Sequence, residues 1–139
     1  MRSFILLYSS YEVIIFMKHY MRLNEGPFNL IKCGSKTIEL RLNDEKRQLI
    51  KKGDVIEFEN RITLEKLKVV VLNLHKYNNF FELYSNFDKI SMGYAEDEEA
   101  NPSDMELYYS REEQEKYGVV GIEIKSYVEE IYDYIRSDS

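Results

Sequence analysis

GSKTIELR, residues 34–41, joins a turn to an amphipathic strand. Glycine and serine favour the turn, and the residues that follow alternate between apolar and polar side chains, as they do in a half-buried β-strand. Side chains on a strand point alternately to opposite faces. The apolar face carries Ile38 and Leu40, and the polar face carries Thr37, Glu39 and Arg41. Because Lys36 lies where the turn becomes the strand, the stretch places an ammonium, a carboxylate and a guanidinium together.

This charged face has two interpretations. In the first, it is an exposed strand surface on which Glu39 and Arg41 form an ion pair worth at most about 1 kcal/mol. In the second, the sheet encloses a hollow, and Lys36 leans over its mouth as a mobile ammonium. Replacing a mobile lysine would leave the melting temperature nearly unchanged. The spacing alone is compatible with both interpretations.

The composition predicts one globular domain. The chain has 139 residues, of which 44% are apolar, 32% charged and 14% aromatic. Its many tyrosines suit a clefted surface as well as a core. One cysteine excludes an intrachain disulfide, and with only two histidines we expect neither a metal site nor a cofactor. We expect Cys33 to be a buried, inert thiol on the apolar side of a short helix, in a reducing, cytoplasmic setting.

The charges are unevenly distributed along the chain. The formal net charge is −6, yet residues 18–53 hold nine basic groups against four acidic ones, and residues 82–115 hold eleven acidic groups against two basic ones. Screening confines each field to about 8–10 Å at physiological salt, so the basic part can still receive an anion. The net charge argues against tight non-specific binding of long nucleic acid, and only weakly against a small nucleotide ligand.

The two ends are expected to stand apart from a domain at residues 18–126. Residues 1–17 are apolar but interrupted by Ser9, Ser10 and Glu12, which makes them too short to span a bilayer. No small-residue cleavage site follows, so a signal peptide is not favoured. We expect an extra strand or helix laid on the domain or, preferably, an extension upstream of a start at Met17 or Met21. Residues 127–139 are predicted to begin with an amphipathic helix packed on the domain.

Between these ends, short strands alternate with single-turn helices. Strands are predicted at 20–23, 37–42, 55–59, 67–74 and 119–125, and short helices at 28–32, 44–49, 80–84, 102–108 and 112–116. Ser110 and Glu113 have the spacing of a capping box. The acidic run at 96–99 is predicted to be a solvated loop. This succession of elements indicates a small curled barrel of the α+β class.

The motif at residues 34–41 resembles the GxKxxExR signature of the ASCH family, small relatives of the PUA fold. Gly34, Lys36, Glu39 and Arg41 supply its fixed positions. The turn and strand KGDVIEF at 52–58 and the YGV at 117–119 follow in the expected order. The similarity covers roughly residues 18–126. It implies a PUA-like barrel of five or six strands, with a cleft beside the signature and RNA or nucleotide binding as its role.

The chemistry of these side chains agrees with such a cleft. Lys36 suits a phosphate or another oxyanion, and Arg41 offers a planar fork that can grip phosphate or stack on a base. Glu39 can accept hydrogen bonds from a base or hold Arg41 in place. Tyr109 and Ser110 can add stacking and a hydroxyl to an RNA or nucleotide site. Both also have structural explanations, since tyrosines pack in cores and Ser110 caps a helix.

A hydrolase is the alternative. Some ASCH proteins resembling this one act as amidohydrolases on N4-acetylcytidine, using the signature lysine, a threonine nucleophile and a downstream glutamate. Here Glu39 stands where that threonine is expected, and Thr37 is about 6–7 Å away along the strand. A hydroxyl that a lysine activates must lie within about 2.6–3.2 Å of the lysine nitrogen. The glutamate would be Glu96, Glu98 or Glu99. Other family members are proposed ribonucleases, a role that here would use Lys36, Tyr109 and Ser110.

Overall fold

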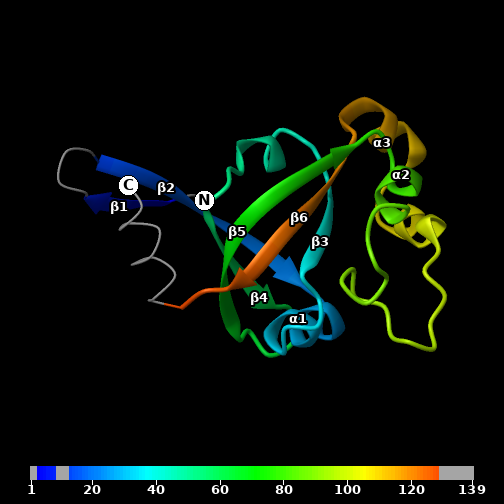
Figure 1. The fold of residues 1–139 in the computed structure, drawn as a ribbon, viewed down its shortest axis with the longest axis horizontal. Helices are drawn as coiled ribbons and strands as arrows, with labels where there is room; N and C mark the ends of the chain where they lie inside the picture. Colours follow the sequence, from blue (N-terminus) through cyan, green and yellow to red (C-terminus); the bar gives the residue numbers. More distant parts are fainter. Residues whose placement is uncertain (1–2, 9–12, 129–139) are drawn as a thin grey trace.

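A computed structural model describes residues 3–8 and 13–128. Within these ranges six strands form one curled sheet with several short helices (Figure 1). The strands are β1 (Ser3–Tyr8), β2 (Val13–Leu23), β3 (Ile38–Leu42), β4 (Val55–Asn60), β5 (Lys66–Tyr77) and β6 (Val119–Ser126). The helices are α1 (Glu25–Lys32), η1 (Arg47–Leu49), α2 (Phe80–Tyr84), η2 (Pro102–Leu107) and α3 (Arg111–Tyr117). The predicted small barrel of the α+β class is confirmed, and it takes the form of a curled half-barrel sheet.

The strand order is β1-β2-β4-β5-β6-β3, which makes β1 and β3 the edge strands. Neighbouring strands are antiparallel except β2 and β4, which run parallel. The long strand β2 pairs with β1 through its first half and with β4 through its second half. It therefore runs across the expected boundary at residue 18. The helix expected after residue 127 falls mainly outside the described residues.

Two hydrophobic clusters hold the domain together. The first lies inside the curl of the sheet and includes Phe28 and Ile31 of α1 against Phe58 and Ile122. The second joins β3 and the start of β6 to α2, η2 and the loop before η2. At about 25 cal/mol for each Å² removed from water, such burial is the main source of stability. We call α2, η2 and α3 the helical end, which lies at the right of Figure 1. The second cluster packs this end against the strand that carries the signature.

Asp54 of the KGD turn is buried, and its hydrogen bonds connect the turn before β4 to β2. Its carboxylate accepts hydrogen bonds from the backbone N–H groups of Met17 (3.0 Å) and Lys51 (2.9 Å). Its Oδ2 also lies 2.8 Å from Nε2 of His19, and both side chains are almost fully buried. The sequence predicted the turn but not the partner, since the two residues are 35 positions apart.

The expectation for Cys33 was wrong, because its side chain is exposed. Cys33 lies at the end of α1, whose buried residues are Phe28 and Ile31. A residue two positions after Ile31 is rotated about 200° around a helix with 3.6 residues per turn. Cys33 therefore lies away from the apolar face.

Candidate functional site

Three charged side chains of the signature form one connected group. Nζ of Lys36 lies 3.3 Å from Oε1 of Glu39, and Nη2 of Arg41 lies 3.0 Å from Oε2 of the same carboxylate. Their side chains are 8%, 5% and 13% exposed, in chain order. We call Lys36, Glu39 and Arg41 the ion triad. The exposed strand surface was therefore the wrong interpretation, and Lys36 is held in place rather than mobile.

The backbone before β3 fixes the position of Lys36. The Lys36 N–H donates to the carbonyl of Leu30 at the end of α1 (3.0 Å), and the next two N–H groups donate to the carbonyl of Ser91 (2.9 Å each). The Lys36 ammonium in turn donates to the carbonyl of Met92 (3.1 Å). The segment is thus tied to both α1 and the loop at residues 88–93.

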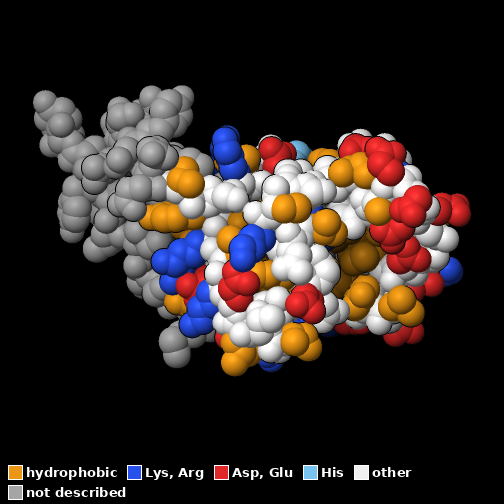
Figure 2. Space-filling view, turned by 90° about the horizontal axis from the view of Figure 1, so that it is seen from below, with side chains coloured by type: hydrophobic (Ala, Val, Ile, Leu, Met, Phe, Trp, Pro, Cys, Tyr) orange, Lys and Arg blue, Asp and Glu red, His pale blue; other side chains and the backbone are white. Residues whose placement is uncertain are grey.

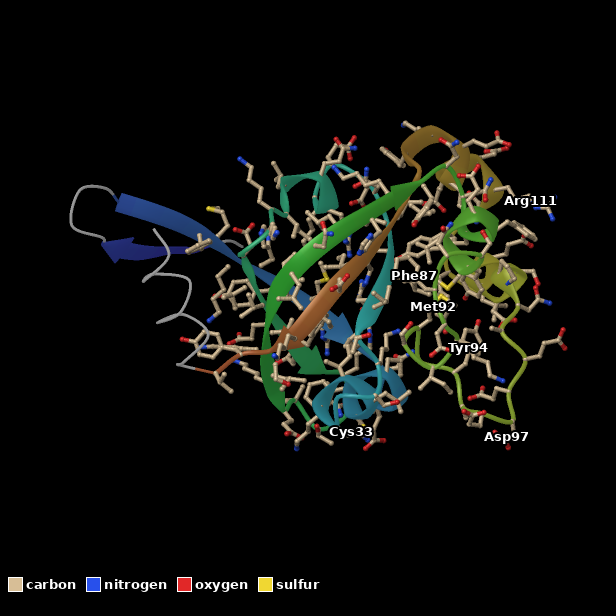
Figure 3. The ribbon with its side chains drawn as sticks, in the orientation of Figure 1. Cys33, Phe87, Met92, Tyr94, Asp97 and Arg111 are labelled. Carbon is tan, nitrogen blue, oxygen red and sulfur yellow. The ribbon has the colours of Figure 1, made fainter. Side chains whose placement is uncertain are left out.

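Gly93 lets this loop approach the lysine. Its φ is +104°, a conformation that L side chains rarely adopt, and an added Cβ would lie 3.0 Å from Cδ of Lys36. Figure 3 shows the neighbouring Met92 and Tyr94 on the loop between the sheet and the helical end. The loop packs directly on the lysine, which explains why Lys36 is buried.

Glu39 and Arg41 keep their charges although they are buried. Burial alone would raise the pKa of the Glu39 carboxyl, but the charges and hydrogen bonds of Lys36 and Arg41 outweigh burial and lower it. For Arg41, burial opposes the charge, whereas Glu39 and then Tyr109 raise its pKa. Glu39 is therefore an ionised acceptor between two cations.

Arg41 also connects β3 to β2, two strands that are not neighbours in the sheet, and we call the line between these two strands the seam. Its Nη2 donates to the carbonyl of Arg22 on β2 (3.2 Å), although β3 is an edge strand beside β6. A cleft of about 650 Å³ lies beside this seam, and all three members of the triad line it. Arg22 and Arg61 also line the cleft, and with Lys36 and Arg41 they make up what we call its cationic wall.

Four tyrosines also line the cleft, and we call them the tyrosine wall. They are Tyr84, Tyr94, Tyr108 and Tyr109. The hydroxyls of Tyr84 and Tyr94 are 2.8 Å apart, and Tyr94 donates to Oδ2 of Asp104 (2.9 Å). Burial first, and then these hydrogen bonds, raises the pKa of Tyr94, which keeps it a donor. Tyr108 is 63% exposed and leaves its ring available at the cleft.

The sequence-predicted residues separate into two groups. Tyr109 joins the triad in the cleft, with its ring stacked on Phe80 at a centroid distance of 6.0 Å. Ser110 does not line the cleft, and instead its hydroxyl and Glu113 form the capping box of α3. The structural explanation for Ser110 is therefore the one that the geometry supports.

Several residues of the cleft were missed by the sequence analysis. They are Arg22, Arg61, Tyr84, Tyr94, Asp104 and Tyr108. For the three tyrosines the abundance of tyrosine was the only signal, and it does not say which tyrosines converge. The acidic run is solvated as predicted, and its Glu98 also lines the cleft. Lys89 holds this loop by donating to the carbonyls of Glu96 and Glu98.

Thr37, the hydroxyl considered for an amidohydrolase, lies on a different side of Lys36. It lines a separate, more apolar recess of about 600 Å³ together with Ile38 and Phe87. Lys36 lines both this recess and the cleft. Thr37 is thus not among the residues that line the cleft.

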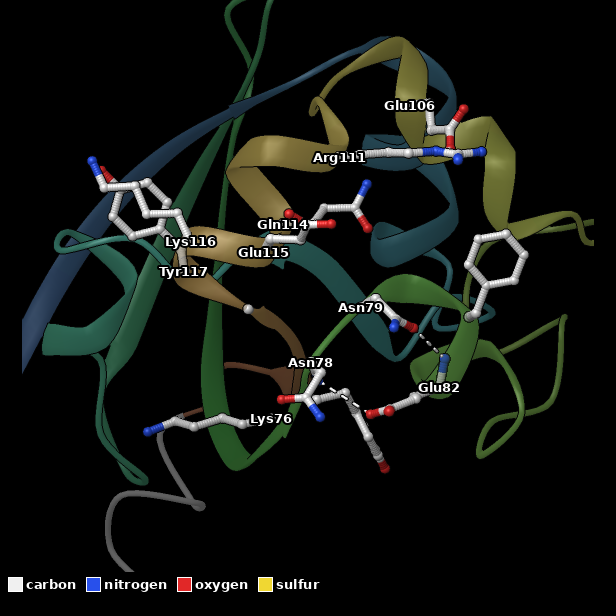
Figure 4. A pocket seen from close by; sticks show the side chains of 13 residues that line it. Lys76, Asn78, Asn79, Glu82, Glu106, Arg111, Gln114, Glu115, Lys116 and Tyr117 are labelled. Carbon is white, nitrogen blue, oxygen red and sulfur yellow. Dashed lines mark hydrogen bonds and ion pairs between the residues drawn. The ribbon is translucent and has the colours of Figure 1, made fainter.

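A larger recess of about 870 Å³ lies on another part of the helical end (Figure 4). It is formed by the end of β5, α2 and α3, and its polar side chains include Asn78, Glu82 and Lys116. Arg111 and Glu106 form an ion pair beside it (2.8 Å), with side-chain exposures of 77% and 34%. We call it the helical recess.

Within the described residues, no three or more His, Cys, Asp or Glu side chains gather so that they could hold a metal ion. None of the helices in the described ranges is long and apolar enough to cross a membrane.

Comparisons with known proteins agree with the fold. The family model of the ASCH domain matches residues 21–127. The crystal structure of the hypothetical protein PH0355 has a TM-score of 0.68 and 36% identity, covering 80% of this chain and 100% of that chain. The solution NMR structure of PF0455 from Pyrococcus furiosus has a TM-score of 0.58 and 38% identity, covering 79% and 97%. A search of curated proteins found no match. The match to the family model spans most of the sequence, and this chain therefore belongs to the ASCH domain family.

Proposed function

We propose that the cleft binds an unpaired nucleotide, either within single-stranded RNA or as a small nucleotide ligand. The observation that carries this proposal is the buried ion triad in a cleft that four tyrosines also line. Burying three charges is costly unless they are paired, and perturbed, buried charges in a cleft are typical of functional sites.

The cationic wall suits a phosphate. An ammonium has three N–H donors, and Met92 and Glu39 account for two of those on Lys36, so one remains for a ligand. Arg22 is 53% exposed along its side chain and can turn toward an anion. Glu39 already faces both cations of the triad with its two oxygens. Its role in this proposal is to position Lys36 and Arg41 rather than to contact a base.

The tyrosine wall suits a base. The exposed ring of Tyr108 can stack on an unpaired base, an interaction worth about 1–3 kcal/mol. Asp104 accepts from Tyr94 through Oδ2, and its other carboxylate oxygen can accept from an amino group of a base. The cationic and aromatic side chains of the cleft therefore suit the phosphate and the base of a nucleotide, respectively.

Binding of a fluorescently labelled single-stranded RNA of eight nucleotides tests the proposal. Tyr108→Ala should weaken binding by about 5- to 150-fold, which corresponds to one stacked base. Phe81→Ala is the matched control, because Phe81 is similarly exposed (57%) but lines the helical recess. Equal loss in both variants, or no binding by the parent protein to this RNA or to mononucleotides, would refute the proposal.

A further inference from the structure

The cleft continues into a second, cationic recess along the seam. This recess has a volume of about 380 Å³ and lies beside β2, β4 and η1. It shares Arg22, Arg41 and Arg61 with the cleft, so the two hollows meet at these three arginines. We call it the seam recess.

The charge of the seam recess is predominantly positive. Besides the shared arginines, Lys46, Arg47 and Lys66 line it, against the two carboxylates of Glu57 and Glu59. Both carboxylates already have partners: Glu57 pairs with Lys18 (3.2 Å) and Glu59 with Arg22 (3.4 Å). The recess therefore has a surplus of cations even after its own acidic groups are counted.

Two of its lysines are available to a ligand. Lys46 and Lys66 are exposed, and among the described residues neither has a carboxylate within ion-pair distance. The Lys46 ammonium donates to a backbone carbonyl, that of Tyr20, at 3.4 Å. Tyr20 lines the recess too, which adds an aromatic side chain to the cationic surface. Cations interleaved with aromatic side chains are the usual surface for a single nucleic-acid strand.

From this continuity we propose that the seam recess is a phosphate subsite for the nucleotides next to the one bound in the cleft. The ligand is then a single-stranded oligonucleotide, and a mononucleotide fills only part of the site. This inference rests on the proposed function of the cleft. An acidic peptide is the other ligand that a cationic recess can accept, but the shared arginines and the tyrosines of the cleft favour a nucleotide chain.

The test compares competitors of different length against the labelled RNA. Unlabelled ribonucleotide chains of one, two, four and eight nucleotides are titrated against the parent protein and against the double variant Lys46→Gln/Lys66→Gln. In the parent, affinity should rise at least tenfold between one and four nucleotides. The double variant should lose most of this gain and bind the mononucleotide as the parent does, because neither lysine lines the cleft.

Salt dependence gives a second measurement. Each phosphate neutralised on a single strand contributes about 0.7 to the slope of log K against log salt concentration. The double variant should therefore show a slope that is smaller by about 1.4 for the longest RNA. The control is Lys76→Gln/Lys116→Gln, which removes the same charge from the helical recess and should leave the slope and the length dependence unchanged.

The outcomes separate the two proposals. If the mononucleotide binds as tightly as four nucleotides, or if the double variant keeps the parent's length dependence, the seam recess is not a subsite although the cleft still binds. If RNA and mononucleotide fail to bind, or if only an acidic peptide binds, both proposals are overturned. Melting temperatures within a few degrees of the parent would show that the variants are folded.

Discussion

The cleft and the helical recess differ in how deeply their paired charged side chains are buried. The helical recess is the larger, at about 870 Å³ against 650 Å³. Its ion pair, Arg111 with Glu106, is largely in water, whereas the ion triad of the cleft is buried. Exposed pairs contribute little, and buried charges carry a desolvation cost of several kcal/mol each. The difference teaches that buried, paired charge marks the candidate site better than the size of a hollow does.

The sharpest way to break this comparison is to remove the central carboxylate. Glu39→Gln leaves Lys36 and Arg41 buried without a counter-charge, so the free energy of unfolding should fall by about 3–5 kcal/mol. Urea denaturation measures it. The matched change in the helical recess is Glu115→Gln, at an exposed position, which should stay within about 0.5 kcal/mol of the parent. Similar losses in the two variants would contradict the comparison.

The parent protein and Glu39→Gln should also differ in how their unfolding free energy depends on pH. The pKa of Glu39 is lowered on folding, so its stabilisation is present above its unfolded value, about 4.3, and is lost as pH falls through the folded pKa. Because glutamine does not titrate here, the difference in unfolding free energy between parent and Glu39→Gln should be constant near neutral pH. It should shrink below about pH 4. A difference that grows toward acid would show that the carboxyl is neutral when folded.

Alanine substitutions at two glycines test whether the loop holds Lys36, and they should have smaller effects on stability than Glu39→Gln. Gly93 and Gly34 both have positive φ, +104° and +86°, so alanine should cost about 1–2 kcal/mol at either. Only at Gly93 does the new Cβ meet Lys36; at Gly34 no atom lies within 4 Å. Gly93→Ala should therefore lower the melting temperature more than Gly34→Ala does. Equal shifts would mean that Lys36 gives way freely and is not held by the loop.

The smallest effect is expected in the helical recess. Arg111→Ala breaks the pair with Glu106, but the arginine side chain is 77% exposed, so its charge is already well solvated. The melting temperature should be indistinguishable from that of the parent in differential scanning fluorimetry. A clear loss of stability would show that this surface pair matters more than its exposure indicates.

The sequence predicted local structure better than it predicted contacts between distant segments. Period-two alternation located β3 and β6, and the capping-box spacing located the start of α3. The burial of Lys36 was not predictable, because it depends on a loop 56 residues away, where the carbonyl of Met92 accepts a hydrogen bond from the ammonium. The structure thus replaces the expectation of an unchanged melting temperature on losing Lys36 with one of clear destabilisation.

The tyrosine wall could not be predicted from the sequence either, because its residues come from distant segments of the chain. Tyr84 is on α2, Tyr94 on the loop between α2 and η2, and Tyr108 directly after η2. They converge only because the second hydrophobic cluster holds these segments against β3. No spacing along the chain encodes such convergence, whereas the signature is a single short stretch and could be recognised directly.

Chemical-shift mapping of RNA binding tests the central claim most directly. A ¹⁵N-labelled sample of the full chain is titrated with the single-stranded RNA of eight nucleotides. The largest shifts should fall on the amides of Gly93, Tyr94, Tyr108 and Tyr109, with little change at Asn78, Glu82 and Lys116 of the helical recess. Shifts that concentrate in the helical recess, or a spectrum that does not change, would contradict the account.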